Sequence, residues 1–156
     1  MNPFGILFHP KAIETYVQRV VNQEFYEEGE LVFHNERYHC FDAHSKWSDS
    51  DKNDLLFNLN SVLKQSFHQI SSLSHVIITF GTAWVYEHIE RQQIVANCHK
   101  IPQKAFSKRI LSINEIVDSL EHIETLIKSV NPGIQFIYTV SPVRHVKDGF
   151  VENTQS

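Results

Sequence analysis

The sequence has few of the features that would assign it to a membrane or to an oxidising compartment. Its two cysteines, Cys40 and Cys98, lie far apart and in no CxxC pattern, so they do not suggest a disulfide framework. No stretch approaches the roughly 18 to 20 consecutive apolar residues that span a bilayer. The N-terminus lacks the cationic segment and long apolar core of an ordinary secretory signal. We therefore expect a soluble, cytoplasmic chain without a membrane partner.

An excess of basic residues is also missing. The chain has 14 lysines and arginines against 18 acidic residues, a formal net charge of -4, and no basic block, so nucleic acid is not an expected partner. What is present is apolar: hydrophobic residues make up 42% of the chain and include 11 phenylalanines, which argues against disorder. A chain of 156 residues can bury one core. Because no repeat or linker divides it, we expect a single domain over residues 1–156.

Three segments predict amphipathic helices, because their apolar residues recur at a spacing of three to four. The first runs from Lys11 to about Asn22, and the second from Asp51 to about Ser71. The third begins at a capping box formed by Ser112 and Glu115 and stops before the Asn-Pro-Gly sequence at residues 131–133. The third helix therefore has both a start and a stop signal in the sequence.

Two uninterrupted apolar runs, His75–Phe80 and Ile134–Val140, predict fully buried strands. The third helix lies between them, so they form a crossover unit that is expected to be right-handed with parallel strands. Two antiparallel pairs are also expected: Leu31–Phe33 with Tyr38–Phe41, and Trp84–Glu87 with Gln93–Ala96. The predicted fold class is α/β.

Polar loops are expected to converge on or near the edge where the two parallel strands end. They comprise residues 2–5, residues 42–48, residues 81–84 with residues 97–100, and residues 141–145. Their hydroxyls, backbone amides, amide side chain and imidazoles suit acyl transfer, in which donors await a developing oxyanion. The same groups also suit binding of a polar ligand such as a sugar. Trp47 is expected to anchor the loop of residues 42–48.

Single residues in these loops leave alternatives open. Ser141 is either a nucleophile or a turn residue, and a turn is favoured because it precedes Pro142 and has no GxSxG elbow around it. His145 is either functional or a surface histidine, and Arg144 either binds a carboxylate or pairs with an acidic side chain. Cys98 and His99 lack a CxxC or HxxxH companion, so neither a metal site nor another cofactor is expected.

Four segments, taken together, match the pattern of a known family. NPFGILFHP from Asn2, FDAHSKWSD from Phe41, TFGTAWVYEH with the later VANCHK, and TVSPVRHVKDGFVEN from Thr139 resemble the GSCFA-domain family of bacterial proteins, in the order of that family and over nearly the whole chain. That family is grouped with the SGNH hydrolases, which include lipases and carbohydrate esterases. The resemblance implies a flavodoxin-like three-layer sandwich with a mostly parallel central sheet, and an ester hydrolase or acyltransferase with an oxyanion-hole loop near Gly81 and Thr82.

The chain departs from this pattern at both ends. The Gly-Ser-Cys-Phe-Ala block, which would offer a nucleophilic serine, normally precedes the Asn2–Gly5 segment, and here the chain begins at Met1. No Asp-x-x-His pair occurs, and Ala83 and Trp84 stand where a Gly-x-Asn-Asp block has its asparagine. We therefore expect an incomplete domain, truncated at both ends, that lacks both catalytic blocks and has no turnover alone.

Three hypotheses about function remain after this comparison. The first is a domain of the esterase or acyltransferase class whose partner is a small-molecule or carbohydrate acyl ester. The second is a non-catalytic domain that binds a glycan or polar metabolite, favoured if Trp47 and Trp84 face a cleft. The third is metal-dependent chemistry through His39, His44, Cys98 and His99. The residues expected to bind substrate are Gly81, Thr82, Asn97, His99, Ser141, Arg144, His145 and His44.

Overall fold

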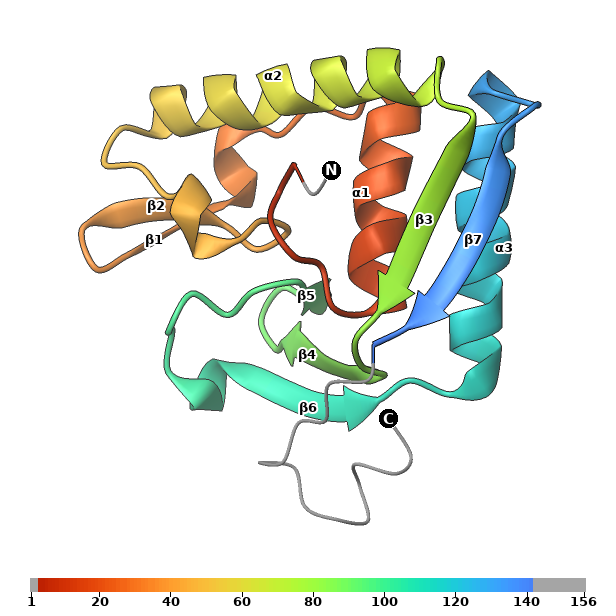
Figure 1. Ribbon diagram of the computed structural model, residues 1–156. Coiled ribbons are helices and arrows are strands. Elements are labelled where there is room, and N and C mark those ends of the chain that lie inside the picture. Colours follow the sequence, from red (N-terminus) through yellow and green to blue (C-terminus); the bar gives the residue numbers. More distant parts are fainter. Residues whose placement is uncertain (1–2, 142–156) are drawn as a thin grey trace.

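The computed structural model describes residues 3–141, which form an α/β arrangement of three helices and seven strands (Figure 1). The helices are α1 (Pro10–Asn22), α2 (Lys52–Ile70) and α3 (Ile113–Val130). All three confirm the prediction from apolar spacing. None of the helices within residues 3–141 is long and apolar enough to cross a membrane.

Side chains cap each helix at its first turn. His9 caps α1 by accepting the Ala12 amide on Nδ1 at 3.1 Å. The Asp51 carboxylate caps α2 by accepting two backbone amides. In α3 the predicted capping box is present: the Ser112 hydroxyl accepts the Glu115 amide at 3.3 Å, and the Glu115 carboxylate accepts the Ser112 amide at 2.8 Å. These bonds satisfy amides that the helix itself leaves without partners.

Replacing Ser112 by alanine is expected to lower the free energy of unfolding by about 1 kcal/mol, because the Glu115 amide loses its acceptor. The effect can be measured by urea denaturation monitored by circular dichroism. Ser129→Ala is the matched control, since its hydroxyl only donates to the Leu126 carbonyl within the same helix. An equal loss in both variants would contradict a capping role for Ser112.

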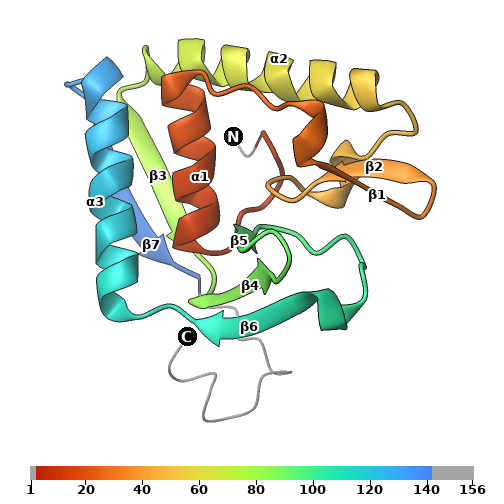
Figure 2. The same ribbon diagram turned by 180° about the vertical axis from the view of Figure 1, so that it is seen from behind.

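The parallel pair consists of β3 (His75–Phe80) and β7 (Gln135–Val140), in register from His75 opposite Gln135 to Phe80 opposite Val140. The parallel orientation confirms the predicted crossover. The expectation that both strands are fully buried is wrong, because α1 and α3 cover one face only (Figure 2). On the other face Ile77 is 65% exposed and Ile137 is 43% exposed. An apolar run cannot reveal whether its second face is covered.

The other strands form two antiparallel sheets. β1 (Leu31–His34) and β2 (Arg37–Cys40) make the predicted hairpin, whose two-residue turn places Asn35 and Glu36 at φ of 50° and 60°. β4 (Trp84–His88) pairs with β5 (Gln93–Val95), as expected, and on its other edge with β6 (Phe106–Ile110), which the sequence did not predict. The described strands therefore form one parallel pair and two small antiparallel sheets.

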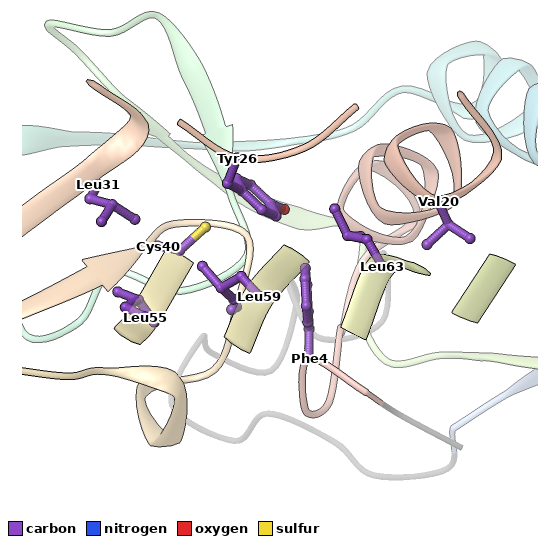
Figure 3. Close-up of a cluster of buried hydrophobic side chains, with 9 residues drawn as sticks. Phe4, Val20, Tyr26, Leu31, Cys40, Leu55, Leu59 and Leu63 are labelled. Atoms are coloured by element: carbon purple, nitrogen blue, oxygen red, sulfur yellow. The ribbon is translucent and has the colours of Figure 1, made fainter. Parts of the chain in front are cut away.

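A buried cluster beneath α2 holds the N-terminal segment in place. Phe4 is 1% exposed and lies beside Leu59 and Leu63 of α2 (Figure 3). Trp47 packs edge-on against Phe4, with ring centroids 6.1 Å apart, and its indole N–H donates to the Pro3 carbonyl at 3.0 Å. This confirms that Trp47 anchors its loop. The segment then runs through the middle of the molecule to α1 (Figure 1).

Candidate functional site

Two of the segments that carry the family resemblance touch at the start of the site. The His44 amide donates to the Phe4 carbonyl at 2.8 Å. Gly5 has a φ of 89°, and a Cβ at this position would lie 2.5 Å from the His44 Cβ. Only glycine fits both the backbone conformation and this close approach. The segment from Pro3 to Gly5 therefore fixes the position of the loop that contains His44.

Asp42 holds the same loop from its other side. Its buried carboxylate accepts the Tyr26 hydroxyl at 3.0 Å and the Gln93 side-chain amide at 3.2 Å, and its Oδ2 lies 3.4 Å from Arg19 Nε. Burial raises the pKa of Asp42, and the Arg19 guanidinium opposes that rise. Both carboxylate oxygens are engaged by these side chains. Asp42 therefore attaches the loop to α1 and β5 and is not a free catalytic carboxylate.

The Asn97–Lys100 turn lies against this loop. The amides of Ala96 and Asn97 both donate to the Phe41 carbonyl, at 2.9 and 3.1 Å. His99 and Lys100 then adopt left-handed backbone conformations, with φ of 51° and 60°. Such conformations are unfavourable for residues other than glycine. The Asn97 side chain stabilises the turn, because its Oδ1 accepts the His99 amide at 2.9 Å.

This turn places the imidazole of His99 in a buried position, with 4% of the residue exposed. Nε2 lies 2.7 Å from the Cys40 carbonyl oxygen. Because a carbonyl only accepts hydrogen bonds, Nε2 carries the ring proton in this arrangement. The rings of His39 and Phe41 lie beside the imidazole, with centroids 4.6 and 6.1 Å away. The Cys40 carbonyl therefore fixes both the tautomer and the orientation of His99.

The other ring nitrogen of His99 faces a hydroxyl group. Nδ1 lies 3.1 Å from Ser45 Oγ, and with the proton on Nε2 it is the acceptor of that hydrogen bond. Desolvation lowers the pKa of His99 to about 4, although the bond to the Cys40 carbonyl opposes that shift. His99 is thus neutral at pH 7, with an unprotonated nitrogen directed at Ser45. This is the arrangement of a general base beside a hydroxyl.

Asn97 completes the group. Its Oδ1 also lies 3.4 Å from Ser45 Oγ, so one side chain contacts both the serine and the histidine backbone. Its Nδ2 has no hydrogen-bond partner among residues 3–141. Ser45 and Asn97 are both half-buried, whereas His99 is fully buried. We refer to Ser45, Asn97 and His99 as the Ser45 cluster.

The structure brings some of the sequence-predicted site residues together and separates others. Asn97 and His99 belong to the Ser45 cluster, and His44 precedes it directly, with Nδ1 accepting the Lys46 amide at 3.2 Å. Gly81 and Thr82 instead donate their amides to the Phe8 carbonyl, at 2.9 and 3.1 Å. Neither amide is available for an oxyanion in this structure. Their contacts attach the N-terminal segment to the end of β3.

The remaining predicted residues follow β7. The Ser141 amide donates to the Phe80 carbonyl at 2.7 Å, which extends the parallel pairing by one bond. Arg144 and His145 lie outside the described residues 3–141. A part in substrate binding remains a prediction for all three.

Ser45 is the residue that sequence reasoning missed. It lies 54 positions before His99, and no serine motif surrounds it. The only available signal was the group of Asp42, His44 and Ser45 in one loop, which marks a site loop without identifying a nucleophile. The partner histidine is in a separate segment, so only the folded chain shows the pair.

The cysteine and metal alternatives receive no support from the local chemistry. Both ring nitrogens of His99 are engaged by protein groups. Burial raises the pKa of the Cys98 thiol, which disfavours the reactive thiolate. Within the part of the chain that the structure describes, no group of three or more His, Cys, Asp or Glu side chains is placed to hold a metal ion.

The fold and the site together define an α/β domain in which two loops bring a serine, an asparagine and a neutral histidine into contact. The chain belongs to the GSCFA family, since the model of that family matches residues 1–156. No curated protein and no solved structure matches it.

Proposed function

We propose that this GSCFA-family chain processes acyl esters, as a hydrolase or acyltransferase of the SGNH type. This proposal replaces the expectation of no turnover, because the Ser45 cluster offers a hydroxyl and a base within the chain. The observation that supports the proposal is the neutral imidazole of His99, held by the Cys40 carbonyl with Nδ1 directed at the hydroxyl of Ser45. Ester hydrolysis needs a base that removes a proton from a hydroxyl or a water molecule, and a histidine with a fixed tautomer serves that purpose. The family resemblance supports the same reaction class.

The substrate that fits the proposal is a small-molecule acyl ester, such as an acylated carbohydrate. The acidic net charge favours such a ligand over nucleic acid. We also propose that the chain is located in the cytoplasm. For the fold, we propose the three-layer SGNH arrangement, in which the parallel β3–β7 pair with α1 and α3 on one face would be part of a larger central sheet.

The non-catalytic glycan-binding alternative has less support. This alternative would be favoured by Trp47 and Trp84 facing a cleft. Trp47 instead packs on Phe4 and donates to the Pro3 carbonyl, so its ring belongs to the core beneath α2. Lys108 Nζ lies 4.4 Å from the centre of the Trp84 ring. The Trp47 ring is therefore occupied by core contacts, and Lys108 occupies one face of the Trp84 ring.

The test is hydrolysis of p-nitrophenyl acetate and of an acetylated oligosaccharide by the purified chain. We expect turnover above the buffer rate, with kcat/KM lowered at least about 100-fold in His99→Gln, because general-base catalysis contributes about 10²–10⁴-fold. His68→Gln is the matched control, since His68 is exposed near the end of α2. Thermal unfolding of both variants checks that they are folded.

A second readout needs no variant. If His99 is the base, kcat/KM for the wild-type chain stays flat from neutral pH down to about pH 5 and falls near pH 4, where His99 takes up a proton. Absence of hydrolysis with both esters would reject the proposed function and agree with the sequence-based expectation of no turnover. Full activity of His99→Gln would reject His99 as the base.

A further inference from the structure

We infer that Ser45 is the nucleophile of this site, with His99 as its general base and the Asn97 side-chain amide as the donor to the oxyanion. The inference rests on the proposed function and goes further, because a base alone would also be satisfied by an activated water molecule. The geometry that supports it is the hydrogen bond between Ser45 Oγ and His99 Nδ1. A serine hydroxyl becomes a nucleophile when an adjacent base accepts its proton.

The single proton of the Ser45 hydroxyl has two possible acceptors in the structure. His99 Nδ1 lies 3.1 Å from Ser45 Oγ, and Asn97 Oδ1 lies 3.4 Å away. Asn97 Oδ1 already accepts the His99 amide at 2.9 Å. The imidazole is therefore the nearer and the less occupied acceptor. Since Nε2 donates to the Cys40 carbonyl, Nδ1 has its lone pair toward the hydroxyl without any rearrangement.

The Cys40 carbonyl takes the position that an aspartate has in a Ser-His-Asp triad. It keeps the N–H of Nε2 in place and stabilises the imidazolium that forms when Nδ1 gains a proton. The ring is used in the opposite sense from that triad, because Nδ1 faces the serine here. A neutral carbonyl stabilises an imidazolium less than a carboxylate does, so we expect slower turnover than with a full triad.

The proposed reaction needs only Ser45, His99, the ester and one water molecule. Ser45 Oγ attacks the acyl carbon of the ester while its proton moves to His99 Nδ1. The tetrahedral intermediate collapses, the alcohol leaves with the proton from Nδ1, and an acyl group remains on Ser45. Water then attacks the acyl carbon and gives a proton to Nδ1, and Ser45 recovers that proton as the carboxylic acid is released. A second alcohol in place of water gives acyl transfer.

The oxyanion of this intermediate needs hydrogen-bond donors close to Ser45. Asn97 supplies one, because Oδ1 is fixed by the His99 amide and Nδ2 is then the free end of a side chain that already contacts Ser45. Nδ2 has no partner among residues 3–141, so it can donate to an oxyanion while Oδ1 keeps its bond to the His99 amide. The amides of Gly81 and Thr82 do not compete for this role, because they donate to the Phe8 carbonyl.

The surroundings of the cluster fit an active serine. Ser45 and Asn97 are half-buried and retain some solvent access, while the base beneath them is buried. The turn at His99 and Lys100, with φ of 51° and 60°, places the imidazole beside the Ser45 hydroxyl.

The experiment is covalent labelling of the wild-type chain with a fluorophosphonate, followed by intact-mass measurement and peptide mapping. We expect one adduct, on Ser45. We also expect kcat/KM for p-nitrophenyl acetate to fall about 10³-fold or more in Ser45→Ala. Ser48→Ala is the matched control in the same loop, because the Ser48 hydroxyl accepts a bond from Arg37 Nε and does not contact His99. It should retain the kcat/KM of the wild-type chain.

The outcomes separate this inference from the proposed function. Hydrolysis that depends on His99 but persists in Ser45→Ala, with no adduct on Ser45, would overturn the inference and leave the proposed function standing with water as nucleophile. An adduct on Ser45 without hydrolysis of either ester would retain the nucleophile and reject the proposed substrate class. Labelling of the wild-type chain decides whether Ser45 is the nucleophile even where Ser45→Ala does not fold.

Discussion

Lowering the pH from about 6.5 to about 4 is expected to weaken the folded state by as much as about 3 kcal/mol through His99 alone. Burial lowers the pKa of His99 to about 4 from its ordinary value of 6.5. Between these values the unfolded chain binds a proton at this position and the folded chain does not. The contribution of His99 to stability is therefore complete above pH 6.5 and is lost as the pH falls through this window.

Other buried groups also change how the free energy of unfolding depends on pH, each in a known direction. Desolvation also lowers the pKa values of His9 and His39, so both add to the loss of stability in acid. Asp42 acts in the opposite direction: its pKa is raised by burial, so the folded chain takes up that proton first, and this partly offsets the loss. His9, His39 and His99 thus all lower the stability in acid, and Asp42 opposes them.

Urea denaturation at pH 7.0, 5.5 and 4.5 measures this dependence. His99→Gln should show a visibly shallower decline of the unfolding free energy with falling pH, whereas His68→Gln should keep the slope of the wild-type chain. An unchanged slope in His99→Gln would show that another group causes the acid sensitivity.

The helices and the parallel pair were predictable because their signals are local. The capping box at Ser112 and Glu115 lies within one turn, and the apolar stripes of α1, α2 and α3 repeat within one segment. The parallel orientation of β3 and β7 followed from the helix between them. Each of these features needs only neighbouring residues or one topological rule.

Features that depend on distant contacts were not predictable. The burial of β3 and β7 was overestimated, because an apolar strand has the same sequence pattern whether one or both of its faces are covered. β6 was missed because its sequence, FSKRI, has only its first and last residues apolar, and it pairs with β4 at one edge of a small sheet. The amides of Gly81 and Thr82 were expected to be open, and the Phe8 carbonyl occupies them.

The same limit applies to the candidate site. Asn97 and His99 were identified from an unusual string, but their partner Ser45 became visible only as a distance in the folded chain. A short motif indicates that a loop is special, whereas a base and its nucleophile are defined by hydrogen-bond reach between segments.

Replacing Gly5 by alanine is expected to lower the free energy of unfolding by about 2–4 kcal/mol, from backbone strain at positive φ and from overpacking. Gly5 has a φ of 89°, and its new Cβ would lie 2.5 Å from the His44 Cβ and 3.1 Å from His44 Cγ. To accept the methyl group, the loop must move away from the segment that Phe4 anchors in the core. Urea denaturation at neutral pH measures the loss.

Gly29→Ala is the matched control, because a Cβ there meets nothing within 4 Å and the residue has no positive φ. Its unfolding free energy should stay the same or rise by about 0.4–1 kcal/mol, from the reduced entropy of the unfolded chain. Since Ser45 follows His44, Gly5→Ala should also reduce ester hydrolysis at temperatures where the variant remains folded. A Gly5→Ala variant as stable as Gly29→Ala would show that the two segments do not touch as described. A destabilised but fully active variant would show that the Ser45 cluster does not depend on this contact.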